Sequence, residues 1–313
     1  MLKKVVGLSA GMALAAAVLA GCGTTPSNTA SAGSAPIHLT DDLHHTITLK
    51  KPATRIITLE PSNVEIALDL GLKSHLVGTD ESTLQYTPAP WKAELAGLRN
   101  IGPSYPGINV EKVVAARPDL VIAGTGIKGI SQLAQFHIPV LILNPTSING
   151  VYHDLLLVGE ATGKTAKATA VIQQMKAQVA AIEKKVATVK ARPTVFYDLG
   201  GLYTTGGGTF LNSLIDMAGA RNVGASLSAQ PWPQVTAEQV VKANPEDILI
   251  DSGSGTSVSA EEQQAGFAVI SAVRTHHVYE VPNPSYVDDP SPALVYGLRE
   301  LIHLLHPNLK VGQ

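Results

Sequence analysis

A stretch of 25 residues without glycine or proline, 165–189, lies near the middle of this 313-residue chain. It consists largely of Ala, Lys, Gln, Glu and Val, and as one helix it would be about 37 Å long. Short apolar segments alternate with helical patterns on both sides of it. This arrangement predicts two α/β lobes joined by one long, rigid helix.

Strand and helix patterns alternate before the long stretch. We expect a hairpin over 37–49, and then a helix that opens at Pro61 with Ser62 as its N-cap and Glu65 completing a capping box. The other expected elements are strands over 55–59, 75–77, 120–123 and 140–143, and helices over 110–116 and 130–136. Such alternation is typical of a mostly parallel sheet with helices on both faces.

A second set of elements follows the long stretch. We expect strands over 194–197, 247–250 and 277–281, and helices over 210–218 and 237–243. Residues 111–123 align without gaps on 238–250, and five of these thirteen positions are identical. The repeat favours two pseudo-symmetric Rossmann-like lobes, although such helix–proline–strand units also recur in unrelated α/β proteins. A cleft between the lobes is the expected place for a small-molecule site.

The N-terminus has the pattern of a secretory signal. Lys3 and Lys4 precede an apolar run over residues 5–19, which as a helix of about 22 Å is shorter than the roughly 30 Å core of a bilayer. The run ends in Leu-Ala-Gly-Cys, which resembles a bacterial lipobox with Cys22 as the lipidated residue. The alternative is an ordinary secretory signal with an incidental cysteine.

These patterns divide the chain into five parts. Residues 1–21 are interpreted as a lipoprotein signal peptide. Residues 22–36 are interpreted as the lipidated cysteine and a flexible tether. An N-terminal lobe over 37–160, a linking helix over 161–190 and a C-terminal lobe over 191–313 then follow.

Composition argues against several classes of protein. The formal net charge is −2 and no basic cluster stands out, so a nucleic-acid partner is not expected. Cys22 is the only cysteine, which leaves the folded part without disulfide or thiolate chemistry. Among the ten histidines, the adjacent pairs cannot share a helix face, and His303 and His306 could share one but have no Cys, Asp or Glu obviously beside them. Structural or solvated roles are therefore expected for the histidines.

Three strings resemble catalytic or nucleotide-binding motifs without meeting their requirements. The G-x-S-x-G string at 7–11 lies in the signal, and the glycines in 159–165 have one residue too few between them for a phosphate loop. The G-x-G-x-x-G string at 124–129 is not followed by the acid that would hold a ribose. We therefore expect no catalytic residues, no metal and no cofactor. An extracytoplasmic hydrolase or metal-dependent enzyme remains the alternative of another class.

Aromatic residues gather in loops that follow the expected strands. Six of the fourteen aromatic residues are placed in this way, namely Tyr86, Trp91, Tyr105, Tyr203, Trp232 and Tyr286. Loops at strand ends commonly carry ligand contacts, and flat aromatic surfaces suit a large planar or macrocyclic ligand. The alternative for each is packing within its own loop.

Five segments carry a family resemblance, namely 41–43, 55–66, 109–113, 118–122 and 205–211. Together they resemble the substrate-binding proteins of bacterial ABC importers for cobalamin, haem and iron–siderophore complexes, the class III periplasmic binding proteins. Residues 231–240 are most similar to the cobalamin-binding member, which has a tryptophan where this chain has Gly124.

The resemblance implies that cobalamin or a related corrinoid is the ligand, with a ferric siderophore or haem as the alternative. It implies ligand contacts at Tyr86, Tyr105, Tyr203, Trp232 and Tyr286.

It also implies that Glu111 and Glu238 dock onto the two membrane subunits of an importer with cytoplasmic ATPases. Both glutamates also suit the first turn of a helix, which is the structural alternative. We expect an extracytoplasmic, lipid-anchored monomer without catalytic activity.

Overall fold

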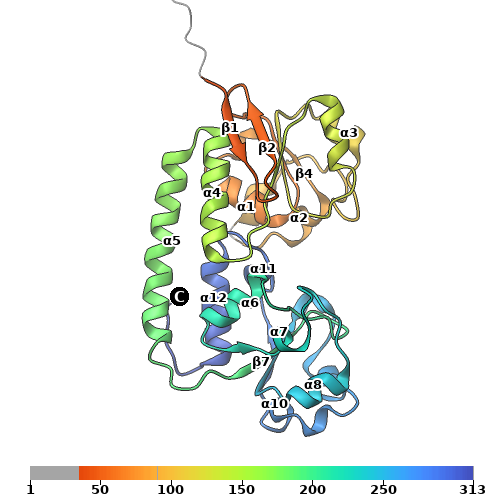
Figure 1. Cartoon of the computed structure of the whole chain (residues 1–313), viewed down its shortest axis with the longest axis vertical. Helices are drawn as coiled ribbons and strands as arrows, with labels where there is room; N and C mark the ends of the chain where they lie inside the picture. Colours follow the sequence, from red (N-terminus) through yellow and green to blue (C-terminus); the bar gives the residue numbers. More distant parts are fainter. Residues whose placement is uncertain (1–34, 90, 313) are drawn as a thin grey trace, which may run out of the picture. The chain divides into compact units, whose positions relative to one another are not determined.

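The computed structural model describes residues 35–89 and 91–312, and Figure 1 shows their elements in chain order. The signal, Cys22 and nearly all of the tether lie outside the described residues. The first elements are strands β1 (Ile37–Thr40) and β2 (Thr46–Leu49), which pair antiparallel. They confirm the predicted hairpin.

The N-terminal sheet has four parallel strands in the order β4-β3-β5-β6. The strands are β3 (Ile56–Thr58), β4 (Leu76–Thr79), β5 (Leu120–Ala123) and β6 (Val140–Ile142). The helices of this lobe are α1 (Pro61–Asp69), η1 (Lys73–His75), α2 (Glu81–Tyr86), η2 (Trp91–Leu95), α3 (Val110–Ala115) and η3 (Ile130–Phe136). Ile56 and Ile57 are both fully buried, in two different apolar clusters, because neighbouring residues of a strand face opposite sides of the sheet.

The C-terminal sheet repeats this arrangement, with four parallel strands in the order β10-β9-β7-β8. Its strands are β7 (Thr194–Asp198), β8 (Arg221–Asn222), β9 (Asp247–Asp251) and β10 (Val278–Val281). Its helices are α6 (Phe210–Met217), α7 (Gly224–Leu227), α8 (Ala237–Ala243), η4 (Ser252–Ser254), α9 (Val258–Glu262), η5 (Phe267–Val269) and α10 (Ser271–Arg274). In each sheet the first strand lies between the second and the third, so the two halves of the internal repeat, α3–β5 and α8–β9, occupy equivalent places.

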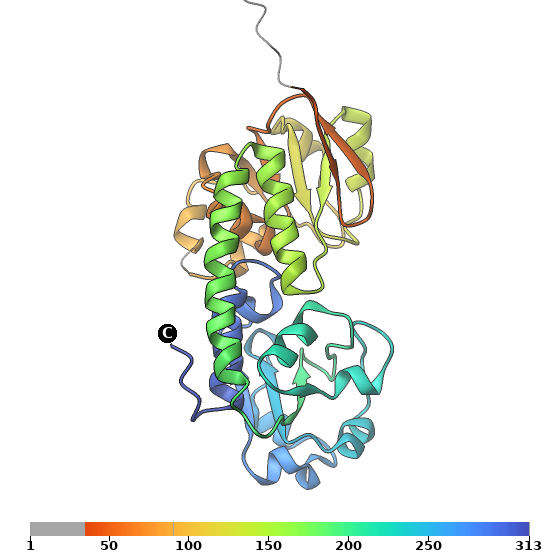
Figure 2. The same cartoon turned by 60° about the vertical axis from the view of Figure 1, so that its left-hand side comes forward.

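The long connecting helix is α5 (Thr165–Val186), which ends three residues before the end of the predicted stretch. Its buried residues recur at helical spacing, Ala168, Ile172, Met175, Val179 and Ile182. This apolar face packs against α4 (Ile148–Thr162) and the last helix, α12 (Leu294–Leu305), neither of which was predicted. Figure 2 shows α4 and α5 running side by side. The helix that links the lobes is therefore supported along its length.

A second connection between the lobes comes from the C-terminal part of the chain. The short helix α11 (Ser285–Asp288) follows the C-terminal sheet but reaches the N-terminal lobe. There the Ser285 hydroxyl donates to the carbonyl of Tyr86 at 3.0 Å, and the Ser291 hydroxyl donates to the buried carboxylate of Glu65. Residues near the C-terminus thus help to fix the two lobes relative to each other.

The structure corrects the predicted start of α1. The helix begins at Pro61, its N-cap residue is Glu60, and no side chain caps it. Ser62 and Glu65 are both buried, so the predicted capping box is absent. Proline suits the first helical position because it has a preset φ and no N–H that needs a partner. Likewise, residues 130–136 form a 3₁₀ helix and not the predicted α-helix.

Within the described residues, no helix is both long enough and apolar enough to cross a bilayer.

Candidate ligand-binding site

A cavity of about 450 Å³ lies between the two lobes and is lined by residues from both. From the N-terminal lobe come the segments that follow β3, β5 and β6, together with one residue of α4. From the C-terminal half come the segment that opens α6, the Pro-Trp-Pro segment and part of α11. Crevices outside the carboxyl ends of parallel strands are the usual ligand sites of α/β folds. The size is within the range of small-molecule pockets. We call this space the interlobe cavity.

The C-terminal wall of the interlobe cavity is mainly apolar and aromatic. Trp232, which is 53% exposed, lines it together with Pro231 and Phe210. Thr209 caps α6, since its hydroxyl accepts a hydrogen bond from the backbone N–H of Asn212 at 3.1 Å. This wall therefore presents the exposed indole ring of Trp232 next to the capped N-terminus of α6.

The N-terminal wall carries Glu60, at the turn between β3 and α1. Its φ of 91° is rarely adopted by residues with a side chain. Its backbone N–H donates to the Asp80 carboxylate at 3.0 Å, and Ser104 donates to the same carboxylate at 2.8 Å. Burial, followed by the charges of Asp80 and Asp289, raises the pKa of Glu60 to about 8. Near neutral pH the group facing this cavity is therefore largely an uncharged carboxylic acid.

Gly124 and Glu60 meet in the cavity wall. The two residues follow β5 and β3, which are neighbouring strands of the sheet. A Cβ atom at position 124 would overlap with both carboxyl oxygens of Glu60. A residue with a side chain cannot replace Gly124 unless Glu60 moves.

Two further carboxyl groups line the interlobe cavity. Burial, and then the neighbouring Asp42, raises the pKa of Asp154 to about 9. Burial, and then the charge of Asp251, raises the pKa of Asp288 well above its usual range, while the Tyr197 hydroxyl donates to it at 3.4 Å. Among the described residues that line the cavity there is no Lys, Arg or His. The site thus lacks the cation that an anionic ligand would require.

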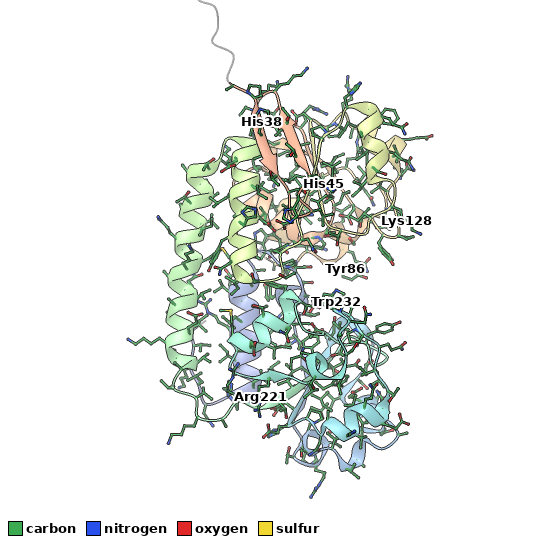
Figure 3. The ribbon with its side chains drawn as sticks, viewed as in Figure 1. His38, His45, Tyr86, Lys128, Arg221 and Trp232 are labelled. Atoms are coloured by element: carbon green, nitrogen blue, oxygen red, sulfur yellow. The ribbon has the colours of Figure 1, made fainter. Side chains whose placement is uncertain are left out.

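Of the five aromatic residues predicted to contact ligand, Trp232 lines the interlobe cavity. Tyr86 ends α2 and is 56% exposed, and in Figure 3 Tyr86 and Trp232 lie on the edges of the lobes that face each other. Tyr105 and Tyr203 are 78% and 49% exposed and lie outside the cavity lining. The structure therefore places Trp232 in the cavity lining and leaves Tyr86, Tyr105 and Tyr203 exposed outside that lining.

Tyr286 has a different environment. Its hydroxyl donates to the backbone carbonyl of Ala89 in the N-terminal lobe, and its ring packs 5.4 Å from that of Tyr296. It lines a separate cavity of about 660 Å³ near α12. Trp91 is buried, and its indole N–H donates to Asp69 at 2.8 Å. In this structure both residues make structural contacts.

Glu111 and Glu238 occupy matching positions, each as the second residue of its helix, α3 or α8. Both side chains are exposed. A hydrogen bond from its own backbone N–H, and then one from the Thr236 side chain, lower the pKa of Glu238. The internal repeat therefore presents one exposed carboxylate in each lobe. In the described part of the chain, no group of three or more His, Cys, Asp or Glu residues is placed to hold a metal ion.

The three carboxyl groups of the cavity, those of Glu60, Asp154 and Asp288, were not predicted from the sequence. Asp154 gave a usable signal, because it stands among apolar residues that recur at helical spacing, such as Val151, Leu155 and Val158. Glu60 gave none, since a glutamate in a turn is ordinarily exposed.

Comparisons with known proteins agree with this architecture. A family model described as periplasmic binding protein matches residues 56–284. An uncharacterized ABC transporter substrate-binding lipoprotein, YvrC of Bacillus subtilis, is 33% identical over 98% of this chain and 99% of its own length. A cobalamin-binding protein of Halobacterium salinarum is 30% identical over 87% of this chain and 75% of its own length.

A similar fold occurs among solved structures. The periplasmic heme-binding protein RhuT of Roseiflexus sp. RS-1, in apo form, superposes with a TM-score of 0.72. The match covers 82% of this chain and 100% of that protein, at 22% identity, so the likeness concerns the fold alone.

Proposed function

This chain belongs to the family of periplasmic binding proteins, and from that premise we propose that it captures cobalamin or a related corrinoid and delivers it to an ABC importer. The observation that carries this proposal is the interlobe cavity, with an indole on one wall and no basic residue among its described lining. The relatives named above support it, since one is named as an importer lipoprotein and another as a cobalamin-binding protein.

The lack of a basic residue in the described lining favours a corrinoid over haem and anionic siderophores. Haem carries two propionates, and ferric catecholate siderophores are anionic, so both would bury negative charge beside Glu60, Asp154 and Asp288 without a cationic partner from that lining. The side chains around a corrin ring are mainly uncharged amides, which can hydrogen bond with carboxyl groups. Part of such a large ligand would lie outside the cavity, where exposed aromatic residues such as Tyr86 could contact it.

We propose docking roles for Glu111 and Glu238. Their matching places in the two lobes suit a partner with two similar membrane subunits, through complementary charge. In this proposal a lipid on Cys22 keeps the protein, as a monomer, close to an importer driven by cytoplasmic ATPases. The lobes 37–160 and 191–313 hold the ligand without catalysis.

Calorimetry of the purified protein with cyanocobalamin, haem and a ferric siderophore tests the ligand. We expect cyanocobalamin to bind with a dissociation constant of micromolar or below, and the anionic ligands to bind more weakly. Binding of a ferric complex or haem, with no binding of cyanocobalamin, would show that the proposed ligand is wrong.

A further inference from the structure

Glu60 stands out among the polar groups of the interlobe cavity because it combines an unpaired carboxyl group with a strained backbone. Asp154 also has no hydrogen-bond partner for its carboxyl oxygens among the described residues, but it lies in a regular helix. Glu60 lines the cavity, yet within the described residues its carboxyl group has no hydrogen bond to another side chain or to the backbone. Asp80 beneath it is different, because Ser82, Thr83 and Ser104 all donate to the Asp80 carboxylate. Glu60 is partly exposed to the cavity, so its unpaired carboxyl group is accessible to a ligand.

The position of this group is set by the surrounding chain. The φ of 91° and the bond from the Glu60 N–H to Asp80 hold the backbone at the end of β3. The absence of a side chain at Gly124 leaves the space that the Glu60 carboxyl group occupies. Strained backbone geometry of this kind is concentrated at functional sites. The backbone is therefore held so that one carboxyl group faces the cavity.

The charged and titratable groups around Glu60 are all acidic. Asp80 lies below it, at the start of α2, and Asp289 lies near it, in the segment after α11. Asp154 and Asp288 line the same cavity from α4 and α11. With no basic residue in the described lining, a carboxylate brought in by a ligand would meet only negative or neutral groups. An amide could instead accept from the acid form of Glu60 or donate to it.

We propose that Glu60 sets the charge selectivity of the interlobe cavity, admitting ligands that bury uncharged amides there and rejecting ligands that bury a carboxylate. The inference rests on the proposed function, and it names the chemical class that the site accepts. The protonated acid is the form that pairs with an amide near neutral pH. Ionisation of Glu60 at higher pH adds a negative charge and sharpens the rejection of carboxylates.

The test compares cyanocobalamin with the derivative in which one peripheral amide is hydrolysed to a carboxylic acid. Dissociation constants for both are measured by calorimetry at pH 6.5 and pH 9, in the wild type, in Glu60→Gln and in the control Glu81→Gln. Glu81 is exposed and lies outside the cavity lining. The carboxylic acid of the hydrolysed derivative stays ionised over this pH range. A change with pH in the ratio of the two dissociation constants, derivative to cyanocobalamin, therefore reflects ionisation of groups on the protein. Neutral ferric trihydroxamate and anionic ferric tris-catecholate complexes are measured in parallel.

In the wild type and in Glu81→Gln, we expect the ratio of the two dissociation constants to rise about tenfold between pH 6.5 and pH 9. In Glu60→Gln the rise should be much smaller, because glutamine does not ionise and only the remaining carboxyl groups, such as Asp154, still titrate in this range. The same rise in Glu60→Gln would overturn the proposal, as would a wild-type ratio that does not change with pH.

Two further outcomes separate this inference from the proposed function. If no corrinoid binds but the ferric complexes do, the proposed ligand is wrong. The charge selectivity is then tested by comparing the dissociation constants of the neutral trihydroxamate and the anionic tris-catecholate complexes at the two pH values. If neither pair binds, both proposals are overturned. If thermal melting shows that Glu60→Gln is unfolded, Glu60→Gly provides a second variant, because glycine adopts the φ of 91° readily and removes the ionisable carboxyl group, which should likewise reduce the rise.

Discussion

The two lobes have the same order of strands and yet contribute different chemistry to the interlobe cavity. In the N-terminal lobe the segment after the first strand contributes Glu60, and in the C-terminal lobe the start of α6 contributes its N-cap Thr209 and its first residue, Phe210. The carboxyl-rich wall belongs to the N-terminal lobe and α11, whereas Trp232 belongs to the C-terminal lobe. The repeated sheet arrangement thus sets where a site forms, while the connecting segments decide what the site recognises.

The largest expected effect concerns Asp154, whose burial in the wall of the interlobe cavity lowers stability as the pH rises. The pKa of Asp154 in the folded state, about 9, is raised from 3.8, so folding favours the neutral acid. Its stabilising contribution is fully present below about pH 4 and is lost as the pH rises towards 9. Asp154→Asn should therefore become progressively more stable than the wild type as the pH rises through that window. Urea unfolding at several pH values measures it.

The control for this change is Glu160→Gln, an exposed position on the same helix. It should show the pH dependence of the wild type. Equal pH slopes in Asp154→Asn and the wild type would contradict the cost assigned to Asp154.

The second effect concerns the aromatic wall. Trp232→Ala should weaken ligand binding by roughly 10- to 100-fold, because it removes a large unpaired surface from the cavity. Phe136→Ala is a matched control, since Phe136 is 50% exposed and lies outside the cavity lining. Calorimetry should show no change for Phe136→Ala. An equal loss in both variants would argue against a ligand contact at Trp232.

The third effect tests the symmetry of the two lobes. Glu111→Ala and Glu238→Ala should each leave ligand affinity unchanged and reduce uptake into cells by about tenfold, since each removes one docking charge. Uptake of labelled ligand and calorimetry of the same variants separate the two roles. A loss of affinity in either variant would refute the separation of binding from docking.

The smallest effect concerns the C-terminal segment that returns to the N-terminal lobe. Tyr286→Phe removes the hydroxyl that donates to Ala89 and keeps the ring that packs on Tyr296. It should lower the free energy of unfolding by about 1 kcal/mol. Thermal melting against Tyr105→Phe, at a highly exposed tyrosine, provides the comparison. An unchanged stability would mean that this hydrogen bond contributes little to holding the lobes.

Much of the fold was predictable from local pattern. The hairpin, the β-branched strands and the long helix all depend on residues close in sequence, and all were confirmed. The start of α1 was not predictable in detail, because Ser62 has the side chain of a good cap but is drawn into the core. The helices α4 and α12 were also missed. The role of Tyr286 could not be read from its loop, because its partner Ala89 lies in the other lobe.

By itself, the sequence determined the alternation of strands and helices, the repeat and the family to which the chain belongs. Only the tertiary structure decided the chemistry of the site. Glu60 and Gly124 meet because β3 and β5 are neighbours in the sheet, and Trp232 reaches the same cavity from the other lobe. The physical reason is that periodicity is a local property of the chain. Burial, and the pKa shifts that follow from it, depend on contacts between residues far apart in sequence.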